Sequence, residues 1–176
     1  MAASDAYVSI GTNLGDRAAH LIGALHGVAA LPETRLVACS PIFETVPYGP
    51  PPQGPYLNAT LRVSTSLAPR TLLDGLLAIE RRAGRVRGAP NAARTLDLDL
   101  LLYADRVVVE PGLVVPHPRL AERPFVLEPL AALAGALVHP LLGESIEALA
   151  ERVRDPAQAW RWCGDDAAFR AQLVAG

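Results

Sequence analysis

The chain has 176 residues, of which 51% are hydrophobic and 19% are charged, and its formal net charge is −2 at pH 7. This length and composition predict one globular domain, or one domain with an appendage, and the near-neutral charge argues against a general nucleic-acid binder. No segment approaches the ~20 apolar residues of a membrane span, and no signal-peptide pattern opens the chain, so we expect a cytoplasmic protein. Every basic side chain is arginine, which excludes a Walker A, protein-kinase or Schiff-base lysine.

Six segments in the first 102 residues carry the pattern of a strand or a helix, taken in chain order. They are a strand over 6–10, a helix from the turn at 11–16 to about Leu31, a strand over 35–44, a strand over 56–65, a helix over 68–83, and a strand over 96–102. The order β-α-β-β-α-β predicts an α+β fold of the ferredoxin-like type, an antiparallel sheet with helices on one face.

The second half of the chain is predicted to add smaller elements. A tight turn at 105–106 leads into Val107 to Val109, where we expect a hairpin, and short helices follow over 125–133 and 145–153. We expect one domain over 1–154 and an extension over 155–176, whose order the sequence does not decide. Two cysteines, Cys39 and Cys163, lack metal-ligand spacing and are expected to be small buried hydrophobes.

The strand at 96–102 carries the strongest functional pattern. Leucine occupies every even position from 96 to 102, while Asp97 and Asp99 are predicted to project from the opposite face. Two residues apart on a strand, their Cα atoms lie about 7 Å apart. Carboxylates that close repel one another unless cations lie between them, which favours Mg²⁺ bridging to phosphate oxygens. A solvated polar face on an edge strand is the alternative interpretation.

A group of arginines precedes this acidic pair. The arginines within fourteen residues are Arg81, Arg82, Arg85, Arg87 and Arg94. Glycine and proline interrupt residues 84–93, which predicts a loop, and guanidinium groups bind phosphate oxygens bidentately. A cationic loop that leads into a carboxylate pair is typical of a polyphosphate and magnesium site, although a solvated run of charges has the same composition.

Four blocks in this order resemble the 6-hydroxymethyl-7,8-dihydropterin pyrophosphokinase family of folate biosynthesis. The blocks are Ile10 to Asp16, the Tyr56-Leu57-Asn58 step, the Arg94 to Leu101 run, and Val115 to Arg119. The resemblance covers roughly residues 5 to 150. It implies transfer of a pyrophosphoryl group from MgATP to the hydroxymethyl group of the pterin, with release of AMP, on a ferredoxin-like fold.

The resemblance also implies roles for individual residues. Asp97 and Asp99 match the ligands of two Mg²⁺ ions, and Arg85 and Arg94 match catalytic arginines. The residues that match nucleotide contacts are Glu80, Arg87, His117 and Arg123. The residues that match the pterin pocket are Thr45, Pro47, Tyr48, Tyr56, Asn58 and Phe125, with Tyr56 and Phe125 as the two stacking rings. The implied partners are these two small substrates only, without nucleic acid or membrane, and we expect a monomer.

Several features leave alternatives open. Glu80 lies within the apolar face of its predicted helix, so it either reaches into a site or pairs with a nearby arginine. Residues 90–93 lack the aromatic residue and the extra basic residue that the family typically carries before Arg94, which puts loop closure in doubt. Two other functions are considered, an Asp-x-Asp nucleotide-sugar transferase on a Rossmann-like parallel sheet, and a non-catalytic ferredoxin-like ligand-binding module.

Overall fold

A computed structural model describes residues 2–47, 52–85, 92–155 and 161–162. The elements in chain order are β1 (Ser4–Thr12), α1 (Arg17–Ala29), β2 (Thr34–Cys39), β3 (Phe43–Thr45), β4 (Tyr56–Thr65), α2 (Pro69–Arg82), β5 (Asp97–Tyr103), β6 (Val108–Glu110), β7 (Leu113–Val115), a 3-10 turn (Leu120–Glu122), α3 (Pro124–Ala134), α4 (Ile146–Val153) and β8 (Arg161–Trp162).

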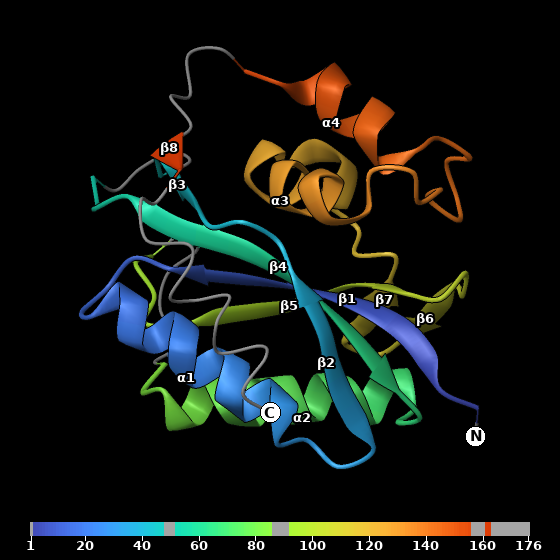
Figure 1. The fold of residues 1–176 in the computed structure, drawn as a ribbon, viewed down its shortest axis with the longest axis horizontal. Coiled ribbons are helices and arrows are strands. Elements are labelled where there is room, and N and C mark those ends of the chain that lie inside the picture. The colour runs from blue at the N-terminus through green and yellow to red at the C-terminus, as the bar shows by residue number, and fades with distance from the viewer. Residues whose placement is uncertain (1, 48–51, 86–91, 156–160, 163–176) are drawn as a thin grey trace.

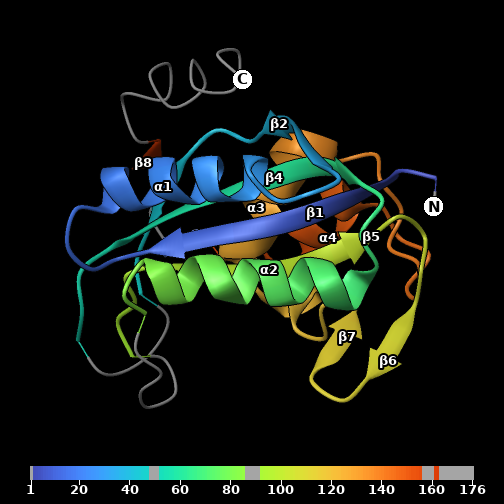
Figure 2. The same cartoon turned by 90° about the horizontal axis from the view of Figure 1, so that it is seen from below.

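The main sheet has the order β5-β1-β4-β3-β8, and β2 also pairs with β4. All pairs among the described strands are antiparallel, which confirms the ferredoxin-like arrangement and removes the parallel sheet that the nucleotide-sugar hypothesis required. Helices α1 and α2 lie side by side on one face of the sheet (Figures 1 and 2). Helices α3 and α4 cover the other face, a placement that the sequence analysis left open.

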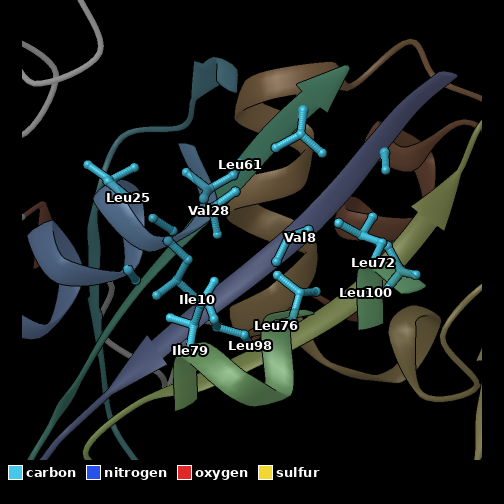
Figure 3. Packing of buried hydrophobic residues seen from close by; sticks show 14 of the residues in the cluster. Val8, Ile10, Leu25, Val28, Leu61, Leu72, Leu76, Ile79, Leu98 and Leu100 are labelled. Atoms are coloured by element: carbon cyan, nitrogen blue, oxygen red, sulfur yellow. The ribbon is translucent and has the colours of Figure 1, made fainter. Parts of the chain in front are cut away.

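Each face of the sheet has its own hydrophobic cluster. The first joins the sheet to α1 and α2 through residues such as Val8, Ile10, Leu61, Leu76 and Leu98, each at most 1% exposed (Figure 3). The second joins Tyr7, Leu101 and Leu102 to the inner sides of α3 and α4. Several polar side chains of the sheet are buried between these layers, among them Thr12, Thr45, Asn58, Thr60 and Thr65.

The leucine pattern of β5 changes face partway along the strand. The register with β1 shifts between Tyr7, which faces Leu102, and Val8, which faces Leu100. Leu101 is the extra residue, so a bulge re-aims the side chains that follow it. The prediction that Leu102 shares a face with the other even-numbered leucines is therefore wrong, because Leu101 and Leu102 both join the α3 and α4 cluster.

The predicted strand over 35–44 is two strands. Pro41 has no amide hydrogen to donate, and the chain leaves the sheet between β2 and β3. Ser40 bridges the break: its amide donates to the Thr60 carbonyl at 2.8 Å, and its Oγ accepts from the Thr60 amide at 2.8 Å. Both halves still pair with β4, so the topology survives the interruption.

The hairpin expected at Val107 to Val109 forms with a different partner. Residues 108–110 pair with β7 and not with β5, and the turn between the two short strands contains Gly112 at φ +72°. The Pro111-Gly112 step was the signal for this turn, since glycine adopts a positive φ without a steric penalty.

The C-terminal segment contributes one short strand within the described residues. Backbone pairs join Phe43 to Trp162 and Glu44 to Arg161, so β8 adds to the edge formed by β3 (Figure 1). Cys39 is buried as expected, whereas Cys163 lies outside the described residues. Among the described residues, no helix is long and apolar enough to cross a bilayer.

The Ser40 bridge generates a stability prediction. Ser40→Ala should lower the free energy of unfolding by about 1–3 kcal/mol, because it leaves the buried Thr60 amide without its acceptor. Chemical denaturation measures the change, with Ser64→Ala on the less buried face of β4 as the matched control. Equal stability of the two variants would show that the bridge contributes nothing.

Candidate active site

The site is built on one row of residues that crosses three strands. Gly11 of β1 is paired on one side with Asn58 of β4 and on the other with Asp97 of β5. A Cβ at Gly11 would lie 3.2 Å from Asn58 Oδ1 and 3.9 Å from Asp97 Cβ. A side chain at this position would push against the Asn58 amide, so a glycine lets the two side chains approach one another over the backbone of β1. Asp99 lies two pairs further along β5, opposite Ser9, and therefore on the same face as Asp97.

Two arginines neutralise Asp97. Arg85 Nη1 donates to Oδ1 of the carboxylate, and Arg94 Nη1 donates to Oδ2. Arg85 follows the end of α2, while Arg94 comes from the segment before β5, so the two guanidinium groups reach the carboxylate from different parts of the chain. The structure thus brings both arginines to Asp97, and their catalytic role stays a prediction.

Glu80, in the last turn of α2, connects β5 to Arg85. It is 3% exposed, and its Oε1 accepts from the Leu98 amide of β5 at 2.7 Å and from Arg85. Burial raises the pKa of the Glu80 carboxyl, against the Leu98 amide and Arg85, which lower it. Of the two interpretations of Glu80, pairing with an arginine is the arrangement in this structure, and a nucleotide contact stays a prediction.

A second pair of cationic or polar groups surrounds Asp99. Its Oδ2 lies 3.6 Å from Arg123 Nη1 and 4.0 Å from His117 Nε2. Burial, reinforced by the neighbouring charge of Asp97, raises the pKa of Asp99 to about 6. Burial and the charge of Arg123 lower the pKa of His117 to about 4, so its ring is neutral at pH 7. Because His117 Nδ1 accepts from the Arg119 amide, the ring hydrogen lies on Nε2.

An open pocket adjoins the acidic pair. It is lined by Gly11, Thr45, Val46, Gln53, Tyr56, Asn58, Arg94, Asp97, Arg123 and Phe125. The Asn58 amide nitrogen donates to Thr45 Oγ1 at 2.7 Å, which orients its Oδ1. Two half-buried aromatic rings, Tyr56 and Phe125, belong to this lining, and Arg123 lies over the Phe125 ring at 5.8 Å from its centroid. The arrangement offers a flat ligand two rings and one amide edge, next to the carboxylates.

Asn13 connects two loops that border the pocket. Its Nδ2 donates to Gln53 Oε1 at 2.8 Å and to the Gly54 carbonyl at 3.1 Å. Its Oδ1 accepts from the Arg94 amide at 2.8 Å, and its own amide donates to the Arg94 carbonyl. One side chain of the β1–α1 turn thus contacts both the proline-rich loop over residues 45–55, at Gln53 and Gly54, and the arginine that binds Asp97.

Most of the predicted site residues lie together. The predicted residues that line the pocket are Thr45, Tyr56, Asn58, Arg94, Asp97, Arg123 and Phe125. The other predicted residues that lie beside them are Asp99, its neighbour His117, Arg85, which pairs with Asp97, and Glu80, which pairs with Arg85. Pro47 is described but is not among the lining residues, and Tyr48 and Arg87 lie outside the described residues. The sequence analysis assigned no role to Gly11, Asn13 or Gln53. A glycine inside a strand pattern was the one signal available, since it indicates a close approach of another group.

These features define a class of protein: a ferredoxin-like domain with an acidic pair, a set of convergent arginines and an aromatic pocket on one sheet face. The model of the 7,8-dihydro-6-hydroxymethylpterin-pyrophosphokinase (HPPK) family matches residues 7–135. The chain belongs to this family.

Curated relatives agree with the family match. A 2-amino-4-hydroxy-6-hydroxymethyldihydropteridine pyrophosphokinase of Pseudomonas aeruginosa is 46% identical over 134 residues, which cover 76% of this chain and 83% of that protein. The enzyme of the same name from Methylorubrum extorquens is 44% identical over 147 residues, covering 83% of this chain and 92% of that one. The folic acid synthesis protein fol1 of Pneumocystis carinii is 36% identical, and the matched region is 20% of its length.

A solved structure supports the fold independently. Plasmodium falciparum HPPK-DHPS, as a triple mutant with STZ-DHP, superposes with a TM-score of 0.68 at 14% identity. The match covers 85% of this chain and 43% of that longer chain. The likeness establishes the shared architecture.

Two substitutions of Asn13 can distinguish its contacts with the two loops. Asn13→Ala should speed amide hydrogen exchange both at Arg94 and around Gly54, because both loops lose their shared partner. Asn13→Asp keeps an acceptor for the Arg94 amide but loses the donor, so only the region around Gly54 should exchange faster. Hydrogen exchange followed by mass spectrometry measures both regions. Unchanged exchange at both regions in Asn13→Ala would contradict the proposed link.

Proposed function

We propose that this protein transfers a pyrophosphoryl group from ATP to the hydroxymethyl group of 6-hydroxymethyl-7,8-dihydropterin and releases AMP. The observation that carries the proposal is the convergence of Asp97, Asp99 and their arginines on the edge of the aromatic pocket. The family and the names of its relatives identify the substrates that this chemistry fits.

The aromatic pocket is the proposed pterin site. Tyr56 and Phe125 offer their faces to a planar heterocycle, and offset stacking stabilises such contacts. Asn58 is the polar group at the floor, with its Nδ2 held by Thr45 and its Oδ1 available to accept from a pterin nitrogen. A ring seated there would direct its hydroxymethyl group toward Asp97, which lines the same pocket.

The acidic pair is the proposed magnesium site. Asp97 and Asp99 are carboxylates on one face of one strand, with side chains 19% and 30% exposed, and hard carboxylate oxygens are the ligands that Mg²⁺ takes. Burial, and after it the charge of Asp97, raises the pKa of Asp99, so a cation bound beside this carboxylate would stabilise its ionised form. Mg²⁺, in two copies by family resemblance, would neutralise phosphate charge and polarise the transferred phosphoryl group.

The arginines are proposed to exchange partners when ATP binds. Arg85 and Arg94 pair with Asp97 in this structure, and a cation at Asp97 would release both guanidinium groups to phosphate oxygens. Arg123 and the neutral His117, both within 4.0 Å of Asp99, are proposed to contact the nucleotide. Glu80 would act by holding Arg85 and the Leu98 amide, and Arg87 is proposed as a further nucleotide contact.

The reaction we propose is an in-line displacement. The hydroxymethyl oxygen attacks the β-phosphorus, the new oxygen–phosphorus bond forms as the bond to the AMP oxygen breaks, and the hydroxyl proton leaves to solvent. Catalysis rests on positioning and on stabilising charge. We also propose that residues 1–154 form the catalytic domain, and that the protein acts as a cytoplasmic monomer.

Product analysis tests this function. With MgATP and 6-hydroxymethyl-7,8-dihydropterin, AMP should form only when the pterin is present, and chromatography of the nucleotides measures it. Asp97→Asn and Asp99→Asn should lose most of this activity through loss of cation binding, whereas Asp105→Asn, in an exposed turn, should keep it. Formation of ADP would contradict pyrophosphoryl transfer.

Arg94 supplies a second prediction. Arg94→Ala should lower kcat by about 10²–10³, the cost of losing a donor to transition-state charge. Steady-state kinetics measures the effect, and Arg106→Ala, which removes an exposed arginine outside the site, is the control. Near-normal turnover in Arg94→Ala would exclude the arginine from the proposed charge stabilisation.

A further inference from the structure

Arg17 ties together the two ends of the proline-rich loop over residues 45–55. Its Nη1 donates to Glu44 Oε1 at 2.8 Å and to the Pro55 carbonyl at 2.8 Å. The guanidinium NH₂ group carries two hydrogens, so one nitrogen can serve both partners. Glu44 immediately precedes the loop and Pro55 is its last residue, so the Arg17 side chain joins the two ends of the loop.

The position of Arg17 in its helix is unfavourable on local grounds. Arg17 is the first residue of α1, where the macrodipole places partial positive charge and disfavours a cation. Asp16 already caps the helix by accepting from the Ala19 amide at 3.0 Å. Because the Arg17 cation does not stabilise its own helix at this position, we look for its role in contacts outside the helix.

That role lies at the pocket. Glu44 is followed by Thr45, and Pro55 is followed by Tyr56, and both of these neighbours line the pocket. Thr45 and Tyr56 are also paired across β3 and β4. A displacement of either loop end would therefore move the residue that orients Asn58 or the ring proposed to stack on the pterin.

We infer that Arg17 is a positioning residue for the pterin pocket, which it holds in shape by joining Glu44 to Pro55 across the loop. The inference rests on the proposed function for the identity of the ligand. Within the described part of the chain, Arg17 makes no hydrogen bond to the acidic pair or to the rings of Tyr56 and Phe125. Its effect is therefore on binding of the pterin and not on the chemical step.

The test compares Arg17→Ala, Glu44→Ala and the double variant. Arg17→Ala should raise the KM for the pterin about threefold to tenfold, the range for one charge-assisted contact, and leave kcat and the KM for ATP within about twofold. The double variant should match Arg17→Ala, because residues that act through one contact are not additive. Peptides containing Thr45 and Tyr56 should exchange their amide hydrogens faster in all three.

Arg62→Ala is the matched control. Like Arg17, Arg62 forms an ion pair with a carboxylate, at 2.6 Å from Asp5, but it is six residues along β4 from Tyr56, about 20 Å away. Its loss should change neither the pterin KM nor the exchange around Thr45. Arg17→Ala should keep its melting temperature, since removal of a cation from the helix N-terminus offsets the lost ion pair.

Two outcomes would overturn the inference. One is an unchanged pterin KM with unchanged exchange at Thr45 and Tyr56 in Arg17→Ala. The other is an equal loss of melting temperature and of both KM values in Arg17→Ala and Arg62→Ala, which would show a general structural effect. Absence of AMP formation by the unaltered protein would instead refute the proposed function, and the exchange measurement would still decide whether Arg17 holds the loop.

Discussion

The structure depends on the repulsion between two carboxylates held on one face of β5. Asp97 and Asp99 cannot move apart, because the leucines between and beside them anchor the strand in the core and their backbone pairs with β1. Their charge must be neutralised from outside the strand. In this structure Arg85 and Arg94 neutralise Asp97, and Arg123 faces Asp99. The arginines that neutralise this pair in the folded protein are the groups that would bind the oxygens of a polyphosphate, while its cations would bind the two carboxylates.

The two layers of helices explain why this corner is both rigid and open. From one face, α2 delivers Glu80 to the edge of β5, where its carboxylate fixes both a strand amide and Arg85. From the other face, the start of α3 delivers Arg123 and Phe125. Gly11 keeps the centre of the row clear, so that Asn58 and Asp97 face one another across bare backbone. The pocket is thus lined by strands of the sheet, by the loops that carry Gln53 and Arg94, and by the start of α3.

Much of this arrangement was predictable from sequence because it follows from local patterns. The alternation over 56–65 and the helix over 68–83 coincide with β4 and α2 almost to the residue. One error has a non-local cause, because the bulge at Leu101 depends on the register with β1. Two others passed over local signals: Pro41 divides the segment 35–44, and the Pro111-Gly112 step turns the chain so that 108–110 pair with β7. For the site, ordered motifs located the charged residues, whereas Asn13 and Arg17 act through contacts with residues about 30 to 80 positions away, which no spacing reveals.

We expect the acidic pair to hold cations and to release its arginines when the nucleotide binds. A crystal structure with Mn²⁺, a non-hydrolysable ATP analogue and the pterin tests it most directly, because Mn²⁺ is located by its anomalous scattering. We expect anomalous peaks in contact with both Asp97 and Asp99, with Arg85 and Arg94 turned from Asp97 to phosphate oxygens. Peaks placed elsewhere, with both arginines still bound to Asp97 beside a fully bound nucleotide, would contradict it.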